Sequence, residues 1–469
     1  MSVYDKAIDW LEEYFRELEK YPVKSLSKPG DIYNQIPPLP PESGENYDAI
    51  FQDVNKKIIP GITHWQHPMF MAYFPANSSE PSLMAEMITA GMGAQCMKWE
   101  TSPAAAELEE RMMQWLRQMI GLPEVFEGVI QDSASSATLC SILTAREKFS
   151  NYNINKYGYS GMPKYRVYCS DQAHSSIERA VRIAGIGSAN LVKVAVNDDF
   201  SMNTSSLEEQ IQKDLKEGLM PLCVVSALGT TSTTAVDDIN RIGDLCEKYR
   251  VWHHVDAAYS GSALILPEYK NLIHGVEKAD SFVFNPHKWL FTNFDCSAYF
   301  VKDKHALINT FSLIPEYLNT GDQDVVNDYS NWGVPLGRRF RALKLWFVIR
   351  HFGVEGLKNK LKAHIEFAHN LKHEIQEHKD FEILAPALFN VICFRYLPAG
   401  VDTNEEINRI NKLLLEKINQ SGKLFLSHTV LNGKYTIRIV TGQTNLTREH
   451  VDQAWRIILR EAEELTSRV

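Results

Sequence analysis

Short runs of β-branched and aromatic residues alternate with helix-like stretches through the middle of the 469-residue chain. The strand-like runs are RVYCS (166–170), LVKVAV (191–196), LCVVSA (222–227), VWHHVDAA (251–258) and SFVFNP (281–286). Helical patterns such as SSIERAVRIAGI and DDINRIGDLCEKY lie between them. This alternation predicts successive βα units on a mainly parallel sheet, with a ligand bound beyond the carboxyl ends of the strands.

The two ends of the chain have a different pattern. Residues 4–18 place apolar side chains at helical spacing, whereas six prolines between residues 22 and 41 exclude a helix there. The C-terminal part combines strand-like runs with a helix and with a hairpin around Asn432 and Gly433. We therefore expect three segments: a helical arm for dimerisation over 1–79, a large α/β domain over 80–345 and a small α+β domain over 346–469.

The composition favours a small molecule as the partner. The formal net charge is -9, the wrong sign for nucleic acid or an acidic membrane. The chain contains no apolar run of about 18 residues, and its acidic, amphipathic N-terminus does not resemble a signal peptide. We expect a cytoplasmic protein. The seven cysteines are widely spaced without a CxxC pair, which argues against a disulfide framework or a zinc–thiolate site.

An acid and a lysine follow two neighbouring predicted strands. Asp256 closes one strand and Lys288 comes directly after the next, so we expect both in one crevice at the carboxyl edge of the sheet. A lysine with a pKa near ~10.4 becomes a nucleophile when burial or a nearby cation lowers that pKa, and His287 is adjacent. A buried acid would keep the ring nitrogen of pyridoxal phosphate protonated, as an electron sink requires. Either residue alone has an ordinary structural interpretation, but the pair favours catalysis.

A phosphate site is expected at SASSATL (133–139), which is predicted to begin a helix near Ser135. Backbone N–H groups at a helix N-terminus bind phosphate, although the same residues also form ordinary helix caps. The chain lacks both GxGxxG and GxxxxGK[ST], which argues against a dinucleotide fold and a P-loop enzyme.

Histidines supply two further candidates. His174, between a strand and a helix, fits either a ring-stacking residue or an ordinary loop histidine. A metal site from His253, His254, Asp256 and His287 is disfavoured because no HExxH or comparable ligand spacing accompanies them. No metal is therefore predicted.

The blocks HVDAAYSGS, FNPHKWL, DQAHSS and SASSATL occur together, and with them the chain resembles the pyridoxal-phosphate-dependent group II decarboxylases, specifically the aromatic-L-amino-acid decarboxylases. The resemblance covers nearly the whole chain and includes HWQHPMFMAYFP (64–75) and PLGRRFRALKLWFVIR (335–350). It implies the aspartate-aminotransferase-like fold (fold type I): a mainly parallel seven-stranded sheet flanked by helices, with a small C-terminal domain. It also implies a homodimer with its active site at the subunit interface.

The resemblance assigns site residues position by position. It implies that Lys288 forms an internal aldimine with pyridoxal 5'-phosphate and that Asp256 pairs with the ring nitrogen. His174 would stack on one face of the ring and Ala258 would lie under the other. The remaining implied cofactor contacts are Ala134, Ser135, Thr231, Asn285 and His287. Tyr317 matches the tyrosine of the family's mobile catalytic loop and is the candidate proton donor to Cα, directly or through His174.

The residues around the substrate ring are less well defined. An apolar ring pocket is implied for Trp65, Tyr73, Phe74 and Pro75, a cluster that also fits ordinary core. Four positions bear on substrate preference. Ala76 replaces a usual threonine, and Met97 and Gln95 replace an aromatic and an aliphatic residue. Gly337 resembles the glycine of indole-accepting plant relatives but also occurs in catechol-using animal enzymes. Preference among tryptophan, tyrosine, phenylalanine and DOPA stays open.

We therefore expect decarboxylation of an aromatic L-amino acid to its arylalkylamine, through an external aldimine and a quinonoid. One alternative is an aromatic aldehyde synthase; family members of that type have Phe at the position of Tyr317, so Tyr317 with His174 favours simple decarboxylation. Histidine or glutamate decarboxylation is a second alternative, although residues 65–75 offer glutamate no evident cation. A noncatalytic homologue that binds the cofactor is a third.

Overall fold

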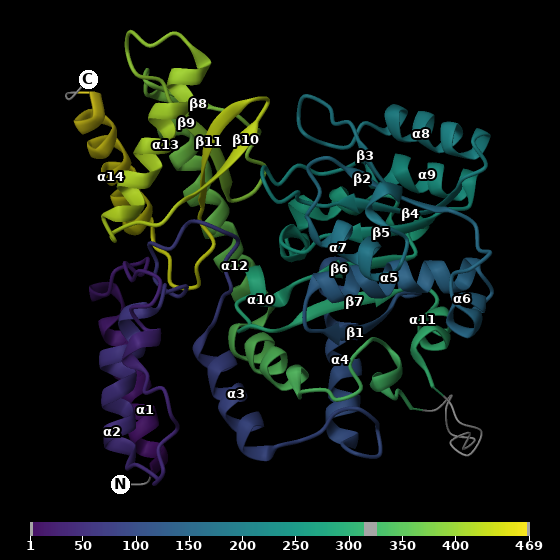
Figure 1. Ribbon diagram of the computed structural model, residues 1–469, viewed down its shortest axis with the longest axis horizontal. Helices are drawn as coiled ribbons and strands as arrows, with labels where there is room; N and C mark the ends of the chain where they lie inside the picture. The colour runs from purple at the N-terminus through teal and green to yellow at the C-terminus, as the bar shows by residue number, and fades with distance from the viewer. Residues whose placement is uncertain (1–2, 314–325, 467–469) are drawn as a thin grey trace. The chain divides into compact units, whose positions relative to one another are not determined.

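The computed structural model describes residues 3–313 and 326–466, which form two compact units (Figure 1). The central unit consists of residues 76–365 and 385–389. The terminal unit consists of residues 1–75, 366–384 and 390–469, so the two ends of the chain fold together. The three segments expected from the sequence, with boundaries after residues 79 and 345, stay a prediction.

A seven-stranded sheet forms the middle of the central unit, with the strand order β1-β7-β6-β5-β4-β2-β3. Strand β7 is antiparallel to both of its neighbours, and every other neighbouring pair is parallel. The strands are β1 (Glu127–Gln131), β2 (Tyr165–Ser170), β3 (Leu191–Val194), β4 (Met220–Ala227), β5 (Trp252–Asp256), β6 (Ser281–Phe284) and β7 (Ser297–Val301). The predicted mainly parallel, seven-stranded sheet is confirmed.

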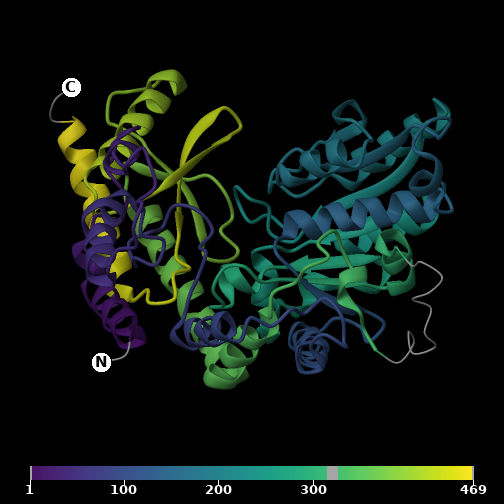
Figure 2. The same cartoon turned by 60° about the horizontal axis from the view of Figure 1, so that its bottom comes forward.

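Helices cover both faces of this sheet (Figures 1 and 2). On one face, α5 (Ala134–Phe149) and α7 (Ser176–Ile183) pack against Val167 and Cys169 of β2. On the other face, α8 (Thr204–Lys216) and α9 (Ile239–Tyr249) pack with Tyr168 of the same strand. Because both faces are buried, apolar side chains occur at consecutive positions in strands such as β4 and β6, and this is why these strands were recognisable in the sequence.

The other helices of the central unit lie around the sheet. They are α3 (Glu80–Met92), α4 (Pro103–Ile120), α6 (Asn153–Tyr157), α10 (Pro286–Trp289), α11 (Lys304–Phe311) and the start of α12 (Arg341–Glu377), together with short 3-10 turns, of which the longest is Pro267–Ile273. Helix α12 has a kink at Gly353, whose φ of 63° and ψ of 168° are not helical. A glycine adopts such a left-handed φ at little cost. The last turns of α12 belong to the terminal unit.

The terminal unit contains a four-stranded antiparallel sheet in the order β10-β11-β9-β8. Its strands are β8 (Phe381–Ile383), β9 (Val391–Tyr396), β10 (Ser427–Leu431) and β11 (Lys434–Val440), and its helices are α1 (Val3–Glu17), α2 (Tyr47–Asp53), α13 (Asn404–Gln420) and α14 (Arg448–Thr466). Asn432 and Gly433 have positive φ, as a two-residue hairpin turn requires.

The N-terminal part of the chain is hydrogen-bonded to the C-terminal sheet of the same unit. The N–H of Met71 donates to the carbonyl of Phe425 at 3.0 Å, and the N–H of Val440 donates to the carbonyl of Met71, also at 3.0 Å. Residues 22–41 are all described by the structure and contain no α-helix, in agreement with their six prolines. Within residues 3–313 and 326–466, no helix is long and apolar enough to cross a bilayer.

Two adjacent histidines of β5 are fully buried and bound to hydroxyl groups. His253 Nε2 lies 2.8 Å from Ser226 Oγ, and His254 Nδ1 lies 2.8 Å from Ser281 Oγ. Burial lowers the pKa of each of these rings to about 3. Both imidazoles are therefore neutral in the folded protein at any pH near neutrality.

We predict that this protein loses stability as the pH falls from 6.5 to 5. In the unfolded chain the histidine pKa returns to about 6.5. Below this pH the unfolded chain therefore binds protons that the buried rings of the folded protein do not bind. The free energy of unfolding should drop by about 1.4 kcal/mol per pH unit for each such ring. Urea unfolding at several pH values measures the slope, which should become shallower in His254→Gln and stay unchanged in His274→Gln, a variant at an exposed ring. An unchanged slope in His254→Gln would contradict the prediction.

Candidate active site

The predicted cofactor residues follow the carboxyl ends of strands that all point in the same direction. Strands β1, β2, β4, β5 and β6 run parallel, since β7 alone is reversed between β1 and β6. The residues after these strands are Ala134 and Ser135 after β1, His174 after β2, Thr231 after β4, Asp256 and Ala258 at the end of β5, and Asn285, His287 and Lys288 after β6. The topology thus brings all of them to one edge of the sheet, which is where ligands of such sheets bind.

Lys288 lies on the short helix α10, next to the strand that ends in Asp256. Strands β5 and β6 pair in parallel, with Asp256 opposite Val283. Burial lowers the pKa of the Lys288 ammonium below its usual value, and the negative charge of Asp256 partly offsets this effect. The lysine therefore has a larger fraction of free amine than a surface lysine, which is the state that attacks a carbonyl group.

The carboxylate of Asp256 is held by a chain of hydrogen bonds. Its Oδ1 accepts the N–H of Ala258 at 3.0 Å, and the carbonyl of Ala258 accepts the N–H of Asn285, also at 3.0 Å. Ser297 Oγ in turn donates to Asn285 Oδ1 at 2.5 Å. The end of β5 and the start of α10 are thereby fixed to each other, so the acid and the lysine share one framework.

His174 has a defined tautomer. Its Nδ1 accepts the N–H of Ser176 at 3.1 Å and lies 2.8 Å from Ser176 Oγ. An accepting Nδ1 carries no proton, so the neutral ring carries its proton on Nε2. Partial burial lowers the pKa of His174, the charge of Asp256 raises it and the charge of Lys288 lowers it. The three groups therefore share one electrostatic environment.

The N-terminus of α5 has the features of an anion-binding element. Ser133 is its N-cap, and its Oγ accepts the N–H of Ser136 at 3.2 Å. The helix begins at Ala134, one residue before the start predicted from the sequence. The first N–H groups of a helix have no partner within it, so those of Ala134 and Ser135 suit a phosphate, and the helix dipole adds a favourable charge.

His287 is buried and neutral. Its Nδ1 accepts the N–H of Cys296 at 2.9 Å, and burial lowers the pKa of the ring to about 3. In the loop after β4, which carries Thr231, the hydroxyl of Thr230 lies 3.1 Å from that of Thr233.

Three features at this sheet edge match three parts of pyridoxal phosphate. The amine with a lowered pKa matches the aldehyde, the fixed carboxylate matches the ring nitrogen, and the helix N-terminus matches the phosphate.

The residues predicted for the substrate ring fall in both units. Trp65, Tyr73, Phe74 and Pro75 belong to the terminal unit, whereas Ala76, Met97 and Gly337 belong to the central unit. Within the terminal unit, Trp65 stacks on Tyr73 with ring centroids 5.9 Å apart, and both rings are partly exposed. Sequence reasoning missed two neighbours of these rings, Phe425 against Tyr73 and Arg438 over Phe74, because no motif marks them.

The segments around Met97 and Gly337 are bound to each other within the central unit. Gln95 Oε1 accepts the N–H of Arg338 at 2.7 Å, and the N–H of Cys96 donates to the carbonyl of Arg338 at 3.0 Å. A Cβ at Gly337 would lie 3.3 Å from Gln95 Nε2, so any larger residue there would press on this side chain. Buried Arg338 is itself paired with Glu109 at 2.6 Å. The structure therefore holds the segment with Gln95 and Met97 against the segment with Gly337.

Two further predictions concern the proton donor and a metal site. Tyr317 lies outside the described residues. Among the residues that the structure describes, no group of three or more histidine, cysteine and acidic side chains could hold a metal ion. His253 and His254 are bound to serine hydroxyl groups instead.

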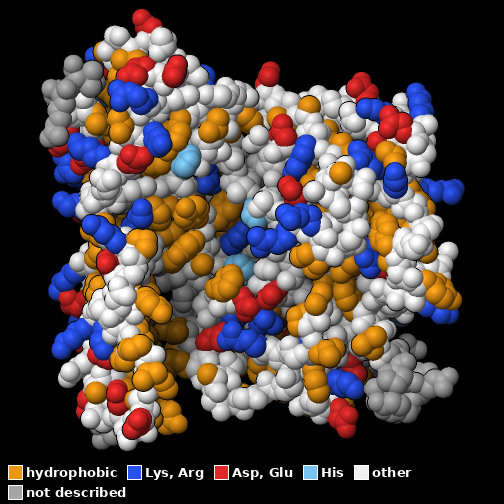
Figure 3. All heavy atoms as spheres, viewed as in Figure 1, with side chains coloured by type: hydrophobic (Ala, Val, Ile, Leu, Met, Phe, Trp, Pro, Cys, Tyr) orange, Lys and Arg blue, Asp and Glu red, His pale blue; other side chains and the backbone are white. Residues whose placement is uncertain are grey.

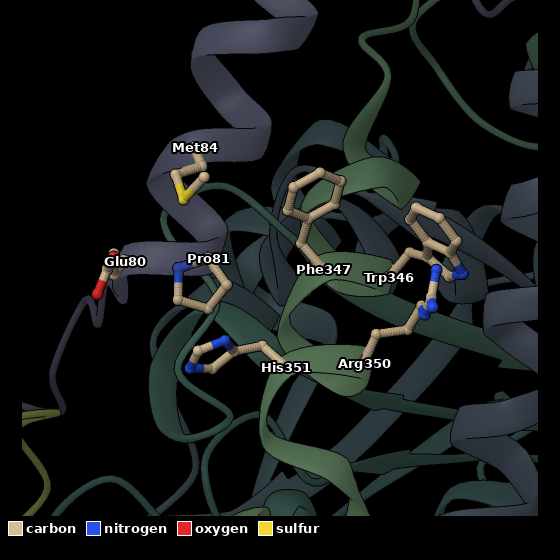
Figure 4. Close-up of a pocket in the computed structure, with 7 residues that line it drawn as sticks. All are labelled: Glu80, Pro81, Met84, Trp346, Phe347, Arg350 and His351. Carbon is tan, nitrogen blue, oxygen red and sulfur yellow. The ribbon is translucent and has the colours of Figure 1, made fainter.

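A hollow of about 330 Å³ lies between α3 and α12, away from the residues at the sheet edge (Figure 4). Figure 4 shows Pro81 and Met84 on α3 facing Phe347 and His351 on α12. Arg350 lies over the ring of Trp346, with the guanidinium carbon 4.7 Å from the ring centroid. No residue predicted for the cofactor or the substrate lines this hollow.

The fold and the residues at this edge define a pyridoxal-phosphate enzyme of fold type I. The model of the pyridoxal-dependent decarboxylase conserved domain matches residues 29–397. The chain therefore belongs to the pyridoxal-dependent decarboxylase family, and the expectations of a decarboxylase with pyridoxal phosphate as its cofactor are confirmed.

Plant proteins are among the similar relatives. Phenylacetaldehyde synthase of Arabidopsis thaliana is 42% identical over 466 residues, which cover 97% of this chain and 94% of the relative. Tyrosine decarboxylase 4 of Petroselinum crispum is 41% identical over 471 residues, 98% of this chain and 92% of the relative. The crystal structure of Oryza sativa TDC with PLP and tryptamine has a TM-score of 0.95 at 33% identity, covering 99% of this chain and 97% of that one.

Proposed function

We propose that this protein converts an aromatic L-amino acid to its arylalkylamine and carbon dioxide, with pyridoxal phosphate as cofactor and Lys288 as the residue that binds it. The observation that carries the proposal is a lysine of lowered pKa next to the strand that ends in Asp256, in a chain of the decarboxylase family. The names of the relatives, tyrosine decarboxylase among them, support an aromatic side chain on the substrate.

Each residue of the site has a distinct task in this proposal. When bound, pyridoxal phosphate supplies the electron sink into which the bond to the departing carboxylate breaks. The amine of Lys288 holds the cofactor and gives way to the substrate amine. The carboxylate of Asp256 keeps a proton on the ring nitrogen, and the N-terminus of α5 binds the phosphate. His174 presents an Nε2–H donor, since its Nδ1 already accepts from Ser176.

The proton that replaces carbon dioxide at Cα must come from the protein. Tyr317 is the proposed donor, directly or through His174. The partly exposed rings of Trp65 and Tyr73 are proposed to receive the substrate ring, because stacked aromatic side chains offer a flat apolar surface. We propose a cytoplasmic location as well, which is supported by seven buried cysteines that are not joined in disulfides.

A panel of tryptophan, tyrosine, phenylalanine, DOPA, histidine and glutamate tests the reaction, with amine, aldehyde and carbon dioxide quantified side by side. We expect amine and carbon dioxide in equal amounts from at least one aromatic substrate. In Lys288→Ala, turnover should fall by at least about a thousandfold because the nucleophilic amine is gone, whereas Lys213→Ala, at an exposed lysine of the same unit, should keep it. Decarboxylation of histidine or glutamate alone, or full activity of Lys288→Ala, would refute the proposal.

Aldehyde formation is the second candidate reaction, because phenylacetaldehyde synthase of Arabidopsis thaliana is 42% identical to this chain. The two outcomes differ in whether Cα receives a proton or the amine is oxidised. Peroxide and aldehyde in equal yield, with little amine, would establish this second reaction for the wild-type protein.

We predict that Tyr317→Phe diverts the product from amine toward aldehyde, because the phenol that protonates Cα is lost. The ratio of aldehyde to amine should rise at least about tenfold, a difference of about 1.4 kcal/mol between the two barriers. Oxygen consumption and aldehyde yield measure the change, with Tyr249→Phe as a control at a distant tyrosine. An unchanged ratio in Tyr317→Phe would remove this residue from the mechanism.

We propose further that the protein is a homodimer with its active site at the subunit interface. Apolar side chains are exposed in each unit: Ile8 and Phe15 on α1, and Met84, Met87 and Met92 on α3. Figure 3 shows hydrophobic side chains at the surface over the N-terminal helices. A monomeric protein seldom exposes several large apolar residues along one helix, so a second copy of the chain is the proposed cover.

Sedimentation velocity tests the dimer. We expect a mass twice that of one chain, and a shift toward the single-chain mass in Met87→Glu because a charge at a buried apolar contact is costly. Decarboxylation should fall together with the dimer fraction if the site needs both subunits. Val430→Glu, at an exposed residue of the β10–β11 hairpin, is the control and should stay dimeric. A monomeric wild-type protein with full activity would disprove the assembly.

A further inference from the structure

The helix that carries Lys288 is too short to hold its own position. Helix α10 contains four residues, Pro286–Trp289. Its local hydrogen bonds run from the N–H of Lys288 to the carbonyl of Asn285 at 2.9 Å and from the N–H of Leu290 to the carbonyl of Pro286 at 3.0 Å. A single turn forms unfavourably by itself, because it fixes several backbone dihedrals for very few hydrogen bonds. The direction of the Lys288 side chain therefore depends on contacts from elsewhere in the chain.

Residues 77–82, just before and within the start of α3, supply such contacts. Asn77 binds two successive carbonyls of α10: its N–H donates to His287 at 3.0 Å, and its Nδ2 donates to Lys288 at 2.7 Å. Farther along, Ser79 Oγ donates to the carbonyl of Phe291 at 2.6 Å, and Ser82 Oγ accepts the N–H of Asn293, also at 2.6 Å. We call residues 77–82 the brace. Asn77, Ser79 and Ser82 are all buried.

We propose that Asn77 is a positioning residue for Lys288, and that its side-chain amide sets the peptide orientation from which the lysine reaches the cofactor. This inference rests on the role of Lys288 in the proposed function. The carbonyl of Lys288 is an acceptor, so the group opposite it must donate, and an amide does so without a charge. Asn77 has 0% exposure, so losing the donor would leave the lysine carbonyl without this partner in a site closed to water.

The two hydrogen bonds of Asn77 differ in what a substitution can remove. The backbone N–H that binds the His287 carbonyl survives any change of side chain except proline, so the brace stays attached to α10. The bond from Nδ2 to the carbonyl of Lys288 is lost with the side-chain amide. The expected effect is a rotation of one peptide at the reactive lysine, and displacement of a catalytic group by about 1 Å costs up to about a hundredfold in rate.

The test compares Asn77→Ala and Asn77→Asp with Ser79→Ala in the holoenzyme. Asn77→Asp keeps the shape but replaces the donor with an acceptor, and Ser79→Ala removes a bond of the same brace three residues beyond the lysine. Four quantities are measured: kcat, KM, the pH at which the visible absorption of the Lys288-bound cofactor titrates, and the rate at which that absorption appears when pyridoxal phosphate is added to the cofactor-free protein. Melting temperatures identify variants that are merely unfolded.

We expect Asn77→Ala to lower kcat about tenfold with KM within about twofold, to slow cofactor capture and to shift the titration of the visible band. Asn77→Asp should show the same changes more strongly, and Ser79→Ala should match the wild type in band and kcat. Equal loss in Asn77→Ala and Ser79→Ala, in step with their melting temperatures, would overturn the inference. A wild-type spectrum and kcat in both Asn77 variants would overturn it as well. Absence of a Lys288-dependent band in the wild type would instead show that the proposed function is wrong.

Discussion

The proposed chemistry depends on two opposing effects on one ammonium group, that of Lys288, which is buried and lies near the carboxylate of Asp256. Burial disfavours the charged form of Lys288, whereas Asp256 favours it, and the net effect is a lowered pKa. A lysine in water would stay protonated and unreactive, and without the acid the cofactor's ring nitrogen would lack the partner that we propose for it. The parallel sheet maintains this balance, because neighbouring parallel strands end at the same edge and the two groups follow the ends of β5 and β6.

Hydrogen bonds turn this balance into a rigid site. Asp256, Ala258, Asn285 and Ser297 are connected in series, and Asn77 holds the far side of the lysine helix. The groups that must be neutral are also kept neutral by burial: burial lowers the pKa of His287 to about 3, and its Nδ1 accepts a backbone N–H. The site therefore contains few charged side chains that can move. This suits a reaction in which charge develops on the cofactor and not on the protein.

The sequence was sufficient to predict the strands that are buried on both faces, since short, largely apolar runs such as LCVVSA of β4 have few other interpretations. It also marked Asp256, His174 and Lys288, because each follows one of those runs. Strand β7 and its reversed direction were not recognisable, because antiparallel pairing with β1 and β6 depends on contacts distant in sequence. Asn77 was missed for the same reason: 211 positions separate it from the lysine carbonyl that it binds. The local sequence pattern indicates which strands are buried. Hydrogen bonds between residues as far apart as Asn77 and Lys288 are seen only in the folded structure.

The hydrogen bonds of Met71 also bear on how the chain is made. Its backbone partners are Phe425 and Val440, which are synthesised 354 and 369 residues later. The seven strands of the central unit all precede residue 302 and can pair long before that point. Met71 therefore stays without these two backbone partners until long after the strands of the central sheet have been made.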